Sequence, residues 1–206
     1  MEDRNPYAAP KVPVVAAPGV DHQFGGEADE LEYGGFWRRF GASLLDGLIA
    51  SPVTVGLLAL LYFTRNAYVY SFLPSILFSL FYYVWLVERY GGTPGKRILG
   101  MRISMADGTR VTRTAALIRN LPMLIFTVLT GIAEILATFS LGDVEFESLG
   151  ILGKITALQA VEPPWNKPLS FVLMGWFVVG AIVLISNPRK RAVHDFLART
   201  MVVRTD

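Results

Sequence analysis

Cysteine is absent from this chain of 206 residues, and histidine occurs only twice. A disulfide framework, a thiolate metal site and a cysteine nucleophile are therefore excluded, and His22 and His194 are the only imidazoles. Charged residues are also scarce: they make up 17% of the chain, compared with about 25% in a typical soluble domain. The formal net charge of +2 is too small to indicate a nucleic-acid partner.

Long apolar stretches stand where charges are missing. Hydrophobic residues make up 52% of the chain. Four windows together contain one charged side chain, Glu134: Gly47–Thr64, Asn66–Val87, Asn120–Gly142 and Pro168–Pro188. With their flanks they reach the ~20 residues that cross a ~30 Å hydrocarbon layer as a helix. The sequence therefore predicts an all-α membrane protein with four transmembrane helices and excludes an ordinary soluble globule.

The composition divides the chain into a tail and a membrane domain. Residues 1–35 are dominated by Ala, Pro and Gly, a composition that buries too little apolar surface to offset the entropy of ordering. We expect a disordered cytoplasmic tail there and a transmembrane domain over residues 36–204. The four spans are expected at these positions: Phe36–Phe63, Ala67–Val87, Leu121–Leu141 and Leu169–Ile185. A helix that starts in Thr114–Asn120 is expected to lead into the third span.

The polar loop Glu88–Arg119 carries turn and strand signals. Asp107-Gly108 is a favoured hairpin turn, and short strand-like segments flank it, Arg102–Met105 and Arg110–Thr112. The sequence predicts a small cytoplasmic β-hairpin, with Thr200–Val203 as a third strand that covers its edge.

The distribution of basic residues predicts the orientation. With four spans, sixteen Lys and Arg residues fall on the side of the two termini, and three fall on the other side, Arg65, Lys154 and Lys167. Because loops rich in Lys and Arg stay in the cytoplasm, we expect both termini in the cytoplasm. The lipid bilayer is the first expected partner.

Two acids lie within the expected spans. Asp46 follows Arg39 by seven residues, which places both on one face of a helix, with Asp46 near the hydrocarbon midplane. An ionised carboxylate there costs at least ~2.5–3.5 kcal/mol. Asp46 is therefore either a hydrogen-bonded structural group or an ion or proton ligand. Glu134 in the third span either shares a cation or proton with Asp46 or stays protonated alone.

Asp195 lies in a basic neighbourhood near the C-terminus. It is either a solvated charge or the partner of Arg39, whose guanidinium fork can bond two carboxylates and would join Asp46 to Asp195.

Three ordered segments resemble the RDD family of bacterial membrane proteins, which is named for one arginine and two aspartates. They are Phe36–Asp46, Gly92–Ile103, and Ala192–Asp195 with the following Thr200–Val203. The resemblance implies that Arg39, Asp46 and Asp195 are the naming residues. It also implies a protein of the bacterial inner (plasma) membrane, for which transport of unknown ligands, or cation/proton exchange, has been suggested.

Two functions follow as hypotheses. The first is a small transporter or cation/proton exchanger, with Asp46 and Glu134 as cation or proton ligands and the Arg39–Asp195 pair as an inner gate. Because four helices enclose little volume, such a transporter would be a homo-oligomer. The alternative is a non-transporting assembly or regulatory partner that works through its cytoplasmic loop and tail. We expect no enzyme, cofactor or metal site, because no nucleophile stands with a base and Gly91–Lys96 lacks the P-loop spacing.

Overall fold

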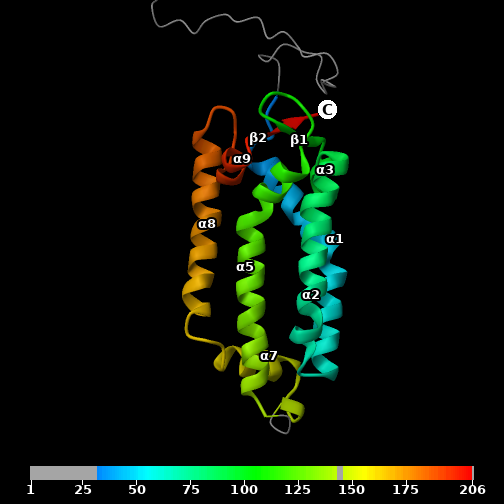
Figure 1. Cartoon of the computed structure of the whole chain (residues 1–206), viewed down its shortest axis with the longest axis vertical. Coiled ribbons are helices and arrows are strands. Elements are labelled where there is room, and N and C mark those ends of the chain that lie inside the picture. The colour runs from blue at the N-terminus through cyan, green and yellow to red at the C-terminus, as the bar shows by residue number, and fades with distance from the viewer. Residues whose placement is uncertain (1–31, 143–145, 206) are drawn as a thin grey trace, which may run out of the picture.

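The computed structural model describes residues 32–142 and 146–205 and consists mainly of helices (Figure 1). The structure has four helices that are long and apolar enough to cross a membrane, which confirms the predicted fold class. Most of the predicted tail, residues 1–31, lies outside the described part of the chain. Residues 32–35 are described, and Tyr33 and Gly34 pair with the C-terminal strand.

The four spans lie close to the predicted ranges and differ from them by a few residues at their ends. The first is α1 (Phe36–Phe63), as predicted. The second consists of α2 (Ala67–Leu80), the π-helical turn η1 (Phe81–Trp85) and α3 (Leu86–Tyr90). The third, α5 (Arg113–Ser140), includes the helical lead-in predicted at Thr114–Asn120, and Thr112 caps it by accepting a hydrogen bond from the Ala115 N–H. The fourth is α8 (Asn166–Ser186).

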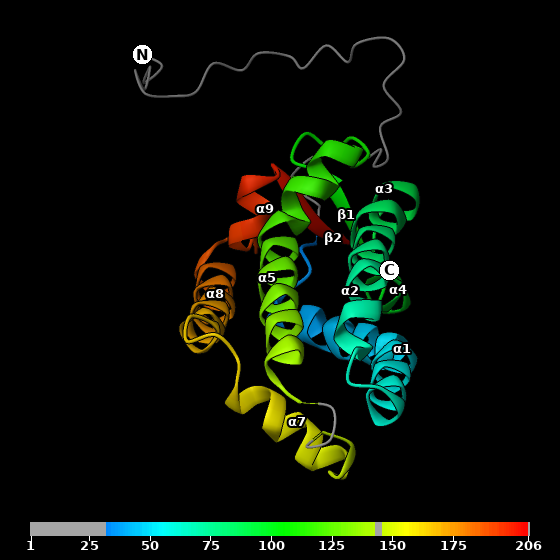
Figure 2. The same ribbon diagram turned by 60° about the horizontal axis from the view of Figure 1, so that its bottom comes forward.

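Short elements close the two ends of the bundle. One end, called here the sheet end, carries α4 (Pro94–Ile98), α9 (Val193–Leu197) and strands β1 (Met101–Met105) and β2 (Thr200–Arg204). The other, the α7 end, carries α7 (Ile151–Ala160). In both views α5 stands between α8 and the α1–α2 pair (Figures 1 and 2). The described N- and C-terminal residues meet at the sheet end.

The strands that form the small antiparallel sheet are not those of the predicted hairpin. β1 pairs with β2 in the register Met101↔Arg204, Ile103↔Val202. The Asp107-Gly108 turn does form, but beyond it only Ser104↔Arg110 makes a bridge. The predicted second strand is therefore wrong, and the predicted third strand is the true partner of β1. β2 buries Val202 and Val203 fully, whereas Arg110–Thr112 buries only Val111.

Burial is concentrated at the ends of the bundle, and lipid-facing side chains remain exposed. At the sheet end an apolar cluster joins Ala42, Val87, Ile103 and Val202, so the sheet packs on the ends of the first, second and third spans. A second cluster at the α7 end includes Leu61 and Phe146. Between them small residues allow close approach, as where the ring of Phe72 covers Gly131 of α5.

Candidate functional site: two buried carboxylates at the sheet end

Asp46 is held by groups from two other elements. It is 4% exposed, and its carboxylate accepts hydrogen bonds from the Tyr82 hydroxyl at 2.7 Å, the Thr93 hydroxyl at 2.6 Å and the Gly95 N–H at 2.7 Å. The Lys96 ammonium lies 3.9 Å away. Asp46 thus ties α4 and the second span to α1, and these hydrogen bonds lower the cost of a carboxylate inside the bundle.

The backbone of α4 reaches Asp46 because Gly95 has no side chain. A Cβ at this position would lie 2.7 Å from Asp46 Oδ1 and still closer to the carbonyl oxygen of Ala42. The π-helical turn η1 includes Tyr82, which is 3% exposed and points its hydroxyl at Asp46. Tyr82 is therefore part of the site.

Asp195 is the centre of a second cluster. It has no exposed surface, and it bonds Arg39 Nη1 at 2.5 Å and Arg119 Nη1 as well. The Ala192 N–H donates to the same carboxylate at 2.9 Å, across the first turn of α9. Burial by itself would raise the pKa of Asp195, but Arg119 and Arg39 together hold it well below its usual range. The group is therefore an anion that joins α1, α5 and α9.

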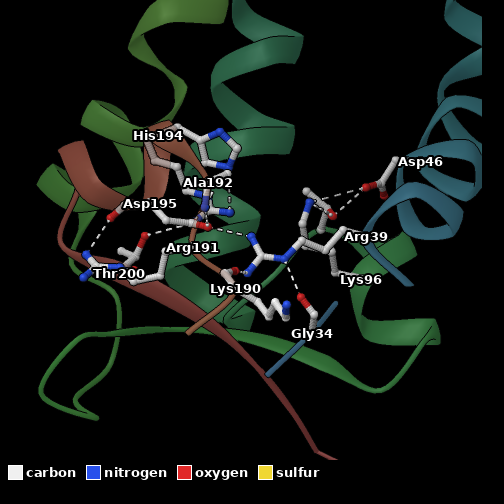
Figure 3. Close-up of polar contacts among 12 residues, drawn as sticks. Gly34, Arg39, Asp46, Lys96, Lys190, Arg191, Ala192, His194, Asp195 and Thr200 are labelled. Carbon is white, nitrogen blue, oxygen red and sulfur yellow. Dashed lines mark hydrogen bonds and ion pairs between the residues drawn. The ribbon is translucent and has the colours of Figure 1, made fainter. Parts of the chain in front are cut away.

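Arg39 bonds one carboxylate and not two. Its Nε donates to the Gly34 carbonyl at 2.8 Å, and its Nη2 donates to the Lys190 carbonyl. With Nη1 on Asp195, each of the three guanidinium nitrogens has a partner other than Asp46. The pair of Arg39 and Asp195 forms as predicted, but the expected continuous chain through Arg39 to Asp46 does not. Figure 3 shows Arg39 between Asp195 and the Lys96–Asp46 pair.

Glu134 is not part of either cluster. It lies six residues before the end of α5 at Ser140, near the α7 end, where Tyr68 and Glu162 are its electrostatic neighbours. Asp46 contacts groups of the sheet end. The structure therefore does not bring the two intramembrane acids together into one site.

The site includes four residues that sequence reasoning missed: Tyr82, Thr93, Lys96 and Arg119. Arg119 was counted only as a loop cation, although its place directly before the apolar run that begins at Asn120 puts it at the edge of a span. Thr93 and Lys96 belong to Gly91–Lys96, which was considered as a phosphate-binding loop and rejected. Among the residues that the structure describes, no cluster of His, Asp and Glu is arranged to hold a metal ion.

A model of the RDD family matches residues 33–199. The chain belongs to the RDD family. This RDD family protein is a membrane protein with four candidate spans, and the matched range includes Arg39, Asp46, Arg119 and Asp195. No curated protein matches the chain.

A pH dependence is expected from His194 of this RDD family protein. Burial and the neighbouring Arg119, with smaller contributions from Arg39 and Lys96, lower the pKa of His194 to about 3, although Asp195 opposes them. Its neutral ring accepts from Arg119 at 3.2 Å. Because the folded pKa is below the ordinary ~6.5, the contribution to stability is complete above about pH 6.5 and is lost as the pH falls towards 3.

The measurement is the melting temperature of the detergent-solubilised protein between pH 7 and pH 5. It should fall with pH, and His194→Gln should flatten this dependence. His22→Gln serves as the control because it removes the only other imidazole. An equal slope in His194→Gln and the parent protein would contradict the assignment.

Proposed function

We propose that this RDD family protein is a small transporter that exchanges a cation for protons across the bacterial inner membrane. The observation that carries the proposal is the position of Asp46, a buried carboxylate of a spanning helix whose hydrogen bonds come from α4 and the second span. A proton or cation that bound Asp46 would compete with these donors. Binding would then be coupled to the contact between α4 and α1.

Lys96 supports the same mechanism. Its ammonium is 3.9 Å from Asp46, so it occupies the position of a tethered cation while α4 lies against α1. A transported cation would displace it and leave the site when Lys96 returns. The Arg39–Asp195 pair at the same end joins α1 to α9 and acts as the inner gate in this proposal.

The orientation of the proposed transporter follows from charge. Of the described Lys and Arg residues, three lie near the α7 end, Arg65, Lys154 and Lys167, and the others lie near the sheet end. The positive-inside rule therefore supports a cytoplasmic sheet end and cytoplasmic termini. We further propose that copies associate, since four helices enclose little volume, and that the protein has no enzymatic activity.

The decisive experiment measures cation-driven proton flux in everted vesicles. Asp46→Asn keeps an acceptor oxygen but cannot carry the charge, and we expect at least a tenfold loss of flux. Asp107→Asn is the matched control, since Asp107 is an exposed acid in a turn at the same end. Equal amounts of monodisperse protein must be compared, so that loss of flux is separated from loss of fold. Unchanged flux in Asp46→Asn would refute the exchange mechanism.

The alternative, a non-transporting partner protein, is favoured by one feature of the same site. Asp46 already has three donors and a cation, as a purely structural carboxylate would. This alternative predicts that one membrane protein co-purifies in fixed ratio. It also predicts that substitutions in the loop before β1 abolish the function of the protein in cells, while Asp46→Asn does not.

A further inference from the structure

A cavity of about 240 Å³ lies at the sheet end between α1, α5 and α8. Every charged residue in its wall is basic: Arg39, Lys96 and Arg119. Asp46 and Asp195 lie behind these side chains and do not line the cavity. With His194 neutral in the same wall, the cavity presents a positive surface.

Lys96 is the cation with the weakest contacts in the cavity wall. Each guanidinium nitrogen of Arg39 has a partner, and Arg119 bonds Asp195, Thr200 and His194. The contacts of the Lys96 ammonium within the described chain are long, 3.4 Å to the Thr93 hydroxyl and 3.9 Å to Asp46. Because an ammonium has three donors, Lys96 can bond an anion in the cavity without breaking a short hydrogen bond.

The rest of the cavity wall is apolar and faces outward. Phe40 of α1 and Phe177 of α8 are 49% and 58% exposed, so the cavity opens on the side of the bundle where lipid lies. The wall from α8 is thin at Gly180, where a Cβ would meet nothing within 4 Å. The cavity is polar at the sheet end and apolar nearer the middle of α8. A lipid in a bilayer has the same order, from its headgroup to its acyl chain.

We propose that this cavity binds an anionic amphiphile of the bilayer, a phosphate-bearing lipid whose headgroup meets Lys96 and whose acyl chain lies between Phe40 and Phe177. The charge of the wall selects the anion, and the lateral opening admits the chain from the membrane. The site does not depend on transport, and it would exist equally in a non-transporting partner protein.

The test is native mass spectrometry of the full-length protein in detergent, with phosphatidylglycerol and phosphatidylcholine of the same acyl chains as probes. We expect at least tenfold preference for phosphatidylglycerol, and loss of that preference in Lys96→Gln. Gly180→Phe should block binding by filling the cavity. Gly175→Phe is its matched control, because Gly175 lies on the same helix, also has open space at Cβ, and does not line the cavity.

Three results would overturn the proposal. They are equal binding of the two lipids, equal behaviour of the Gly180 and Gly175 variants, and displacement of phosphatidylglycerol by inorganic phosphate at the same concentration. The last result would mean that the site recognises a free anion. Because none of these measurements involves flux, failure here is distinct from failure of the exchange mechanism.

Discussion

Asp195→Asn is expected to destabilise the folded protein by about 3–5 kcal/mol, the usual effect of breaking a buried ion pair. The substitution removes the negative charge that pairs with both Arg39 and Arg119, whose side chains are each 9% exposed. Two guanidinium ions would then lie side by side in the bundle without a counter-ion. Asparagine keeps the size of the side chain, so the loss reports charge and hydrogen bonding and not a cavity.

Stability in detergent, followed by thermal unfolding, measures this effect. Glu88→Gln is the matched control because Glu88 also pairs with an arginine of α5, Arg113, but at the protein surface. The control should unfold at the temperature of the parent protein, since exposed ion pairs contribute little. If Asp195→Asn and Glu88→Gln shift the melting temperature equally, the buried cluster does not hold the sheet end together.

Gly95→Ala is the second substitution with a large expected effect on stability. The new methyl group would overlap the carbonyl oxygen of Ala42 and lie 2.7 Å from Asp46 Oδ1, so α4 must move away from α1. Overpacking of this kind typically costs about 1–3 kcal/mol, and the displaced Gly95 N–H would also lose its bond to Asp46. We expect less folded protein in the membrane and a lower melting temperature.

Gly47→Ala provides the comparison for Gly95→Ala. Gly47 lies next to Asp46 in α1, and a Cβ there would meet nothing within 4 Å. Alanine at a helical position of this kind should be neutral or slightly stabilising. A melting temperature of Gly95→Ala equal to that of Gly47→Ala would show that α4 is not held against α1 by close approach.

The spans were predictable from the sequence because a membrane crossing imposes a length and an absence of charge, and α1 and α8 match the expected ranges closely. The contact of Arg39 with Asp195 was also anticipated, as the partner that the basic neighbourhood and the family resemblance suggested. Both predictions rest on features that a linear sequence displays directly: composition along a window and the order of motifs.

The remaining features depend on how segments meet in space. Nothing in the spacing of Tyr82 shows that a π-helical turn directs its hydroxyl to Asp46, and nothing near Arg119 reveals Asp195 as its partner. The strand partner of β1 was mistaken because the Asp107-Gly108 turn is a local signal, while the burial of Val202 and Val203 is a tertiary one. Glu134 and Asp46 are both acids in spans, but their depth in the bundle separates them.

The pairing of β1 with β2 has a consequence for biosynthesis. Residues 195–204 are the last part of the domain to leave the ribosome, yet they supply both the carboxylate for Arg39 and Arg119 and the strand that pairs with β1 and with residues 33 and 34. All four spans can insert before this end is closed. A nascent chain that stalls or is truncated before Asp195 would thus leave two arginines without a counter-ion and β1 without a neighbour, a form that quality-control proteases can recognise.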